Sequence, residues 1–282
     1  MQLVQETNSA QRGKKIIMKF NSRFFEEQGI IKEDPESSVE KILPLLKEIS
    51  ENLRKEGVPV NDDCRINMEE FSDLRGTEEI KKDKEKIKNR EESWYGGLSD
   101  EKIIKEKQNE KDGEKLEMLT IALFSKFLRE RFVVARSSRY DDIFNGVDTI
   151  ILEKETGNLV CAFDEVADTS GPDLQGKIKD VTEKNKKGSR LKYGLIMKDG
   201  KIEKGNIEGA PIFYLALPKE RINDGIKNLS ASAEKTDYEK KLFKYFIDLI
   251  QLQYSAFRLE KDISKGKVET FKSVLEKLKE SR

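Results

Sequence analysis

The chain has 282 residues, enough for one large domain or two smaller ones. Its 54 basic and 54 acidic residues balance, so its composition differs from that of a strongly basic nucleic-acid-binding protein. The sequence contains no histidine, which excludes Ser-His-Asp and Cys-His catalysis and histidine-bound zinc or haem. Acid–base chemistry must therefore use carboxylates, lysine, tyrosine or metal-bound water.

The N-terminal region, residues 1–75, is predicted to be helical. Residues 1–35 carry one amphipathic patch and otherwise show weak patterning. From Ser37 to Arg54, apolar residues recur at helical spacing, although Pro44 argues against an unbroken helix. Residues 76–112 are dominated by Lys, Glu and Asp, which predicts a solvated charged helix followed by a linker.

Residues 113–230 are predicted to form an α/β core. Glu114 to Arg131 has the apolar stripe of a helix, and three strand-like segments follow it. A second helix is expected to begin at Pro172, because proline suits the first turn of a helix. Two more strand-like segments then precede a short charged helix. The strands are expected at residues 132–137, 146–154, 158–168, 191–197 and 211–217.

Residues 231–282 are predicted to form C-terminal helices. Asp237 to Leu259 and Val268 to Leu278 both carry apolar residues at helical spacing. The core is therefore expected to have helical extensions at both of its ends. These extensions could form a homodimer.

The cellular location is predicted from the cysteines and the hydropathy. The apolar runs are far shorter than the ~20 residues that span a membrane, and the N-terminus has no signal-peptide core. Cys64 and Cys161 are far apart, and Cys161 lies in an apolar segment, where a buried reduced thiol is the usual state. We therefore expect a cytoplasmic protein without a membrane partner.

Carboxylates inside apolar elements are the most informative feature of the sequence. Glu117 falls on the apolar side of the first core helix, Asp148 interrupts a strand-like run, and Glu165 sits inside another. An unpaired ionised carboxylate in such an element is costly, so these three are expected to share a counter-charge. Because hard cations prefer oxygen ligands, a divalent cation such as Mg²⁺ is the simplest candidate.

The alternation of side chains along a strand makes this prediction more specific. Phe163, Glu165 and Ala167 share one face of their strand, whereas Asp164 lies on the other. If Asp148 and Glu165 lie on adjacent strands and on the same face, their carboxylates can converge on one cation. A register that differs by one residue would make Asp164 the inward-facing acid instead.

The order of these motifs resembles that of the PD-(D/E)XK nuclease superfamily, which has the restriction endonuclease-like fold. Its members have an α-β-β-β-α-β core with a mixed sheet, a helix Glu, a strand Asp and then an acid-x-Lys motif. The matching segments are Gly113-Glu-Lys-Leu-Glu117, Asn145-Gly-Val-Asp148 and Phe163-Asp-Glu-Val-Ala167. The resemblance implies a nuclease that hydrolyses DNA and binds Mg²⁺ or Mn²⁺ through Asp148, Glu165 and Glu117.

The lysine of the acid-x-Lys motif is replaced by Ala167. In active members, that lysine is thought to position the attacking water and to stabilise developing charge. Lys177 and Lys179 on the next helix, or Lys192 on the next strand, could take over this role, and we favour Lys179 as the catalytic lysine. Alternatively, the chain is an inactivated nuclease, or a non-catalytic nuclease-fold protein that binds a partner or serves as a scaffold.

Three charged residues between the first two core strands have further predicted roles. Asp142 could approach the metal ion, and Arg136 and Arg139 could contact phosphate groups, although arginines near a turn are often only exposed. A plain helical interaction protein is the third hypothesis. The five strand-like segments argue against it.

Overall fold

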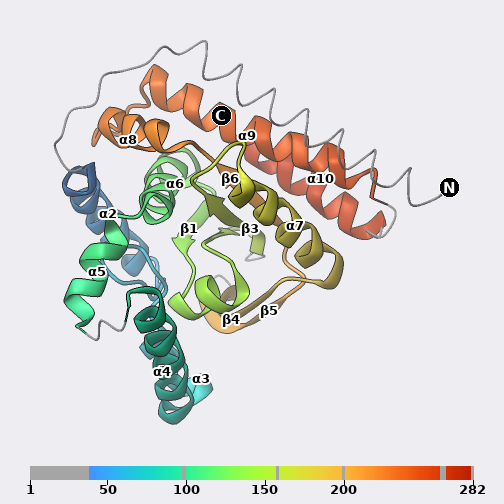
Figure 1. Cartoon of the computed structure of the whole chain (residues 1–282). Coiled ribbons are helices and arrows are strands. Elements are labelled where there is room, and N and C mark those ends of the chain that lie inside the picture. Colours follow the sequence, from blue (N-terminus) through green and yellow to red (C-terminus); the bar gives the residue numbers. More distant parts are fainter. Residues whose placement is uncertain (1–37, 97–99, 157–158, 199–200, 261–264, 281–282) are drawn as a thin grey trace.

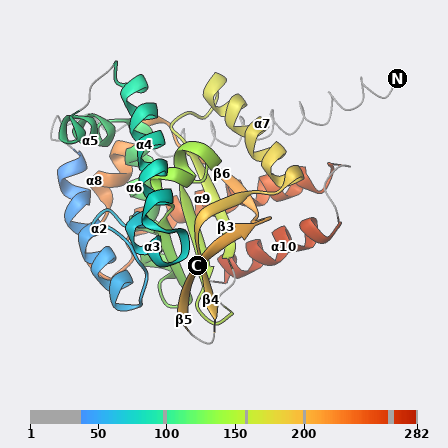
Figure 2. The same cartoon turned by 90° about the horizontal axis from the view of Figure 1, so that it is seen from below.

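The computed structural model of the protein describes residues 38–96, 100–156, 159–198, 201–260 and 265–280. It confirms the predicted α/β class: a mixed sheet lies among helices, and further helices occupy both ends of the chain (Figures 1 and 2). In the described residues, the main sheet consists of β1 (Phe132–Arg136), β2 (Thr149–Glu153), β3 (Leu159–Val166) and β6 (Ile212–Ala216), in this order. β1, β2 and β3 are antiparallel neighbours, whereas β6 is parallel to β3.

The predicted α-β-β-β-α-β order is confirmed. Helix α6 (Asp112–Leu128) precedes the sheet, and α7 (Pro172–Lys187) connects β3 to the part of the chain that leads to β6. α6 and α9 (Asp237–Phe257) pack on one face, where the ring of Phe124 lies 5.2 Å from the rings of both Phe163 and Phe243. α7 covers the opposite face.

The N-terminal region packs directly on the core. Helix α2 (Ser38–Lys55) contacts α6 and continues through Pro44, which is exposed. After it, the chain lies against β1: Arg136 donates its backbone N–H to Cys64, and Ile66 donates to Arg136, both at 3.0 Å. These bonds extend the edge of the main sheet. Residues 60–66 are therefore part of the core fold.

The remaining helices bear out the prediction of helical extensions. The charged segment before the core, predicted as one helix followed by a linker, forms two helices, Thr77–Trp94 and Glu101–Asn109. At the C-terminus, Phe271 packs against Phe257 and Phe213, with ring centroids 5.1 and 5.5 Å apart. The other elements are η1 (Met68–Phe71), α3 (Ser72–Arg75), α4 (Thr77–Trp94), α5 (Glu101–Asn109), α8 (Lys219–Asn228) and α10 (Lys265–Lys279).

A separate two-stranded hairpin differs from the prediction. β4 (Arg190–Lys198) was predicted, but it pairs with β5 (Lys201–Glu208) and not with the main sheet. At an irregularity of this pairing, the backbone N–H groups of Lys192 and Tyr193 donate to the side chain of Asp141, at 2.6 and 3.0 Å. β5 escaped prediction because its side chains are exposed or half-buried and mostly polar, without an apolar run.

The predictions about membrane spans and cysteines can be compared with the structure. None of the helices in the described ranges is long and apolar enough to cross a membrane. Cys64 and Cys161 are free thiols and both are buried. The weak patterning predicted for residues 1–35 lies outside the described residues.

Candidate functional site

Asp148 and Glu165 lie beside each other on neighbouring strands. Asp148 directly precedes β2, Glu165 lies near the end of β3, and they are only 6% and 5% exposed. The backbone N–H of Glu165 donates to Oδ2 of Asp148 at 2.7 Å. The hydroxyl of Thr149 donates to Oε1 of Glu165 at 2.8 Å. The structure thus brings together two of the carboxylates that the sequence indicated.

Hydrogen bonds from the described residues leave part of this pair of carboxyl groups unsatisfied. Oε2 of Glu165 is buried and, in the described residues, has no hydrogen-bond partner. Burial, followed by the charge of Glu117, raises the pKa of Glu165 to about 8. Burial also raises the pKa of Asp148 well above its usual range, and Glu117 and Asp164 add to this effect. An ionised pair in this setting needs a cation to offset the loss of hydration.

Helix α7 brings a lysine to the pair from the other face of the sheet. Lys177 and Lys184 form ion pairs with the two oxygens of Asp164, and the Lys184 pair is 2.8 Å long. Burial lowers the pKa of Lys177, but the attraction of Asp148, Asp164 and Glu165 outweighs it and raises the pKa above its usual range. Lys177 is therefore the ammonium group of α7 that interacts with both candidate ligands.

The other two lysines considered from the sequence lie elsewhere. Lys179 is exposed on a different side of α7 from Lys177. Lys192 forms ion pairs with Glu79, at 2.6 Å, and with Asp83. A signal for Lys177 was present in the sequence, since it shares the helical spacing of the buried Leu174, Val181 and the half-buried Lys184.

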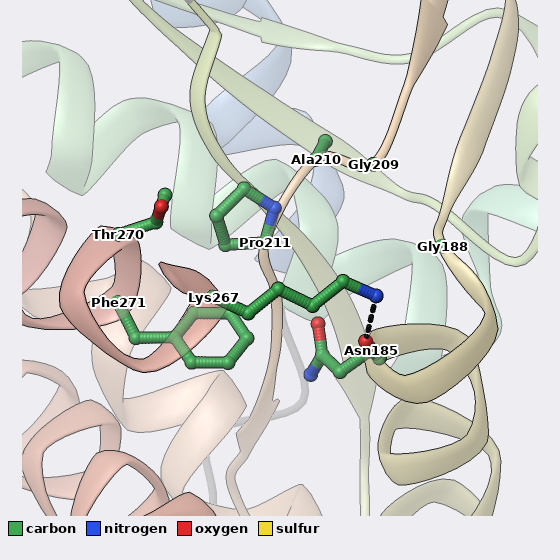
Figure 3. A pocket seen from close by; sticks show the side chains of 8 residues that line it. All are labelled: Asn185, Gly188, Gly209, Ala210, Pro211, Lys267, Thr270 and Phe271. Carbon is green, nitrogen blue, oxygen red and sulfur yellow. Dashed lines mark hydrogen bonds between the residues drawn. The ribbon is translucent and has the colours of Figure 1, made fainter. Parts of the chain in front are cut away.

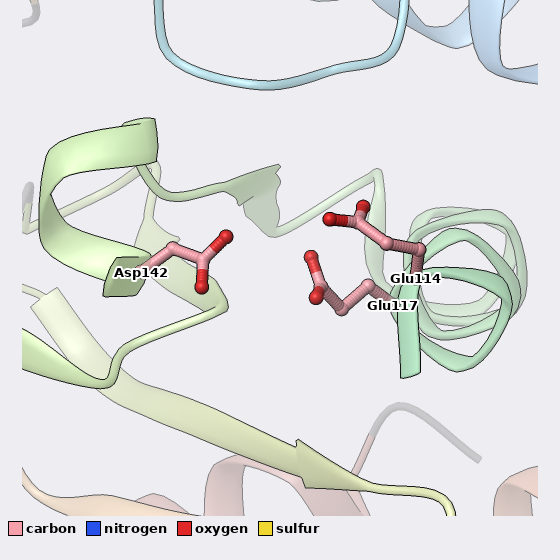
Figure 4. A group of neighbouring side chains, drawn as sticks. All are labelled: Glu114, Glu117 and Asp142. Atoms are coloured by element: carbon pink, nitrogen blue, oxygen red, sulfur yellow. The ribbon is translucent and has the colours of Figure 1, made fainter. Parts of the chain in front are cut away.

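Glu117 points into a different cluster of charges. Its Oε2 accepts hydrogen bonds from Nη2 of Arg65 at 3.0 Å and Nη2 of Arg136 at 2.5 Å. Glu117 forms an acidic triad with Glu114 and Asp142, because one oxygen of each lies within 4.8 Å of the others (Figure 4). Such a triad could hold a metal ion, but in this structure it is bound by arginines.

Arg136 and Arg139, which the sequence suggested as phosphate contacts, form ion pairs with the acidic triad inside the protein. Arg136 is 1% exposed and is bound to two of the acids. Arg139 reaches Glu91 at 2.7 Å, Glu114 at 2.9 Å and Asp142 at 2.6 Å. Neither guanidinium is thus available for phosphate as the sequence suggested. Asp142, predicted to approach the metal, belongs to the acidic triad instead.

The two glutamates of the acidic triad respond differently to their surroundings. Burial and the neighbouring charge of Glu114 raise the pKa of Glu117 to about 7, because they outweigh its arginine partners. For Glu114, burial is opposed by Arg136, Arg65 and Arg139, which together hold its pKa far below the usual range. Glu114 is therefore the ionised acid of the two near neutral pH.

A small pocket lies away from these charges, between the C-terminal end of α7 and α10 (Figure 3). Its volume is about 30 Å³, enough for little more than a water molecule. Lys267 borders it and donates to the backbone oxygens of Asn185 and Lys186 at 2.7 and 2.9 Å. Lys267 therefore caps the C-terminal end of α7 at the border of this pocket.

Comparisons with known proteins found no match among family models, curated proteins or solved structures. The function of the protein is therefore inferred from the geometry of its buried charges.

Proposed function

We propose that the protein is a metal-dependent nuclease of the PD-(D/E)XK type, which hydrolyses phosphodiester bonds in DNA. The observation that carries the proposal is the buried Oε2 of Glu165, which has no hydrogen-bond partner among the described residues, in a residue whose backbone N–H binds Asp148. A divalent cation would supply both a partner and the missing charge. Ligands that are all carboxylate oxygens favour a hard ion, Mg²⁺ or Mn²⁺.

The residues of the site have distinct roles in this proposal. Asp148 and Glu165 would hold the ion, while the Thr149 hydroxyl and the Glu165 backbone N–H fix the orientation of their carboxylates. The bound ion supplies positive charge that stabilises the phosphoryl oxygens as the bond breaks. Glu117, the third ligand predicted from the sequence, does not bind the ion in this proposal, since its Oε2 is held by arginines.

Lys177 takes the role of the motif lysine that Ala167 replaces. Its ammonium group pairs with Asp164 on the α7 face of the sheet, and its charge attracts both candidate ligands, Asp148 and Glu165. An ammonium group in this position can orient the attacking water and offset negative charge on the phosphate. Lys177 replaces Lys179 in this role, because Lys179 is exposed.

Cleavage of DNA tests the proposed function. The purified chain is expected to cut DNA in Mg²⁺ or Mn²⁺ and to stop when the ions are chelated. Asp148→Ala is expected to abolish both cleavage and binding of the ion, whereas Asp173→Asn, an exposed acid on α7, should change neither. Activity that persists in Asp148→Ala would rule out the assignment.

A non-catalytic nuclease-fold protein that binds a partner or acts as a scaffold is the second candidate. The observation that favours it is the acidic triad, in which arginines engage the predicted third ligand, Glu117. This candidate predicts no cleavage with any divalent ion, even after Ala167→Lys. Recovery of activity in Ala167→Lys would instead identify an inactivated nuclease.

Two predictions about the surroundings of the protein accompany the proposal. The helical extensions are proposed to form a homodimer, which light scattering on the purified protein would detect. The free, buried thiols of Cys64 and Cys161 support the proposal of a cytoplasmic protein, because disulfides are rare in that compartment.

A further inference from the structure

We infer that Arg65 is a fixed counter-cation in the acidic triad, so that the protein binds one divalent ion where its carboxylates could hold two. This inference rests on the proposed function, because it assigns the number of ions near the same site. The Arg65 guanidinium donates to Asp142 at 2.9 Å, to Glu117 at 3.0 Å and to Glu114 at 3.4 Å. It therefore bonds to all three acids that would otherwise surround a metal ion.

The arrangement of the acidic triad suits a cation. Oxygens that bind one ion at ~2.0–2.6 Å lie within about 5 Å of one another, and Glu114, Glu117 and Asp142 meet this condition. Figure 4 shows the two glutamates of α6 directed toward Asp142. The side chains of Arg65 and Glu117 are only 8% and 9% exposed, so water hydrates their charges poorly. A cation must occupy the triad, and Arg65 provides one.

The other two arginines fill this role less completely. Arg136 is bound to both glutamates of the acidic triad, whereas Arg139 is bound to Glu114 and Asp142. In the described part of the chain, Arg65 is the cationic side chain with bonds to all three acids. Removal of Arg65 is therefore the change that best exposes the triad to an added ion.

The backbone holds Arg65 in place. Asn61 donates its N–H to the carbonyl oxygen of Arg65 at 2.8 Å, and Ile66 donates to Arg136 of β1 at 3.0 Å. Since this segment extends the main sheet, the guanidinium enters the triad from a rigid element. The N-terminal region thus contributes a charge to the candidate site. Glu117 and Asp142 also act electrostatically on Asp148, which links the triad to the proposed metal ligands.

Counting the Mn²⁺ ions bound by the full chain tests this inference. Electron paramagnetic resonance at pH 8 is expected to find one ion per chain in the natural protein and two in Arg65→Ala. Arg65→Lys should bind one ion because it keeps the charge. Arg54→Ala should also bind one, since Arg54 forms an exposed pair with Asp62. Asp142→Asn added to Arg65→Ala should restore one ion. Two ions in the natural protein, or no additional ion in folded Arg65→Ala, would overturn the inference.

Thermal unfolding covers the case in which Arg65→Ala does not fold without metal. Mn²⁺ is then expected to restore a cooperative transition in Arg65→Ala but not in Arg65→Ala with Asp142→Asn. A failure of Mn²⁺ to restore the single variant would overturn the inference. If the natural protein binds no ion and Arg65→Ala binds one, the role of Arg65 stands and the Asp148–Glu165 centre is wrong.

Discussion

Neighbouring buried acids of this protein differ sharply in how many polar or charged partners offset their burial. Asp164 has two lysine partners on α7, whereas Glu165, the next residue, receives one hydroxyl on Oε1 and, in the part of the chain that the structure describes, nothing on Oε2. Strand alternation explains the contrast, because the two side chains point to opposite faces of β3. The residue with the unsatisfied oxygen is the one beside Asp148. This is the pattern expected when stability is given up for binding.

Substitution of these two neighbours should have opposite consequences. At pH 8.5, above the raised pKa of Glu165, Glu165→Gln removes a charge that the metal-free site does not compensate, so the free energy of unfolding should stay equal or rise by about 1 kcal/mol. Asp164→Asn, the matched control, leaves two lysines without their partner and should cost about 2–3 kcal/mol. Urea denaturation without divalent ions measures both. A loss above about 2 kcal/mol in Glu165→Gln would contradict the view that its charge is uncompensated.

The lysines of α7 allow a sharp test of the proposed chemistry. Lys177→Met should lower the cleavage rate by about 10²-fold, because it removes positive charge beside the reacting phosphate. Lys184→Met also breaks an ion pair with Asp164, and Lys179→Met removes an exposed charge. In a plasmid-cleavage assay, Lys179→Met should keep its activity, and Lys184→Met, which also loses the bond to Gly146, should lose less activity than Lys177→Met. Equal losses in Lys177→Met and Lys184→Met would show that Lys177 has only a structural role.

The sequence supports some of these residue assignments and not others. The cost of burying charge pointed to Asp148 and Glu165, and strand alternation separated Glu165 from Asp164. The role of Arg65 was out of reach, because it lies 49 to 77 residues from its partners in the acidic triad. Such a contact depends on how the chain packs, and no local pattern encodes it.

The turn before Asp148 is the element that places the site. It is a π-helical segment, η2 (Asp141–Asn145), and it ends at Gly146, whose φ of +57° is left-handed. Lys184 donates to the carbonyl oxygen of Gly146 at 2.7 Å, so α7 holds this turn directly. A π-helical turn is frequent at functional sites, and this one leads into a candidate metal ligand.

Two glycine substitutions test whether this turn needs the left-handed backbone and the close contact with Lys184 at Gly146. Gly146→Ala should cost about 1–2 kcal/mol for the left-handed backbone, and its Cβ would also collide with Nζ of Lys184. Gly176→Ala on α7 meets no atom within 4 Å and should stabilise the helix by about 0.5–1 kcal/mol. Thermal unfolding compares the two variants. A neutral Gly146→Ala would show that the turn is not held as the structure indicates.

Elements with a clear periodic pattern were predictable, and elements defined by packing were not. α7 begins at its expected residue because Pro172 suits the first turn of a helix. β2 begins only at Thr149, because the π-helical turn occupies residues 141–145 and Asp148 lies between that turn and the strand. β4 was predicted, but its separation from the main sheet depends on the bonds of Asp141, which no periodicity reveals.

At the scale of the whole molecule, the raised pKa values predict an unusual pH dependence. Burial and Glu117 raise the pKa of Glu165 to about 8, from an ordinary value near 4.5. Between these values the folded protein holds more protons than the unfolded chain, so the free energy of unfolding must fall as the pH rises. We expect a loss on the order of 3 kcal/mol between pH 5 and pH 8.5 in metal-free protein.

Chemical denaturation across this pH range measures the effect, with Glu165→Gln as the control that should flatten the slope. Mn²⁺ at pH 8.5 should restore the lost stability, because the ion replaces the protons on the carboxyl groups. A stability that stays constant or rises between pH 5 and pH 8.5 would show that the carboxyl groups are compensated without metal.

The most direct test of the central claim is a crystal soaked in Mn²⁺, with anomalous diffraction used to locate the ion. We predict one peak, coordinated by Asp148 and Glu165, with Lys177 as the nearest ammonium group and no peak in the acidic triad of Glu114, Glu117 and Asp142. A crystal in which Mn²⁺ occupies the acidic triad, or does not bind between Asp148 and Glu165, would contradict this assignment.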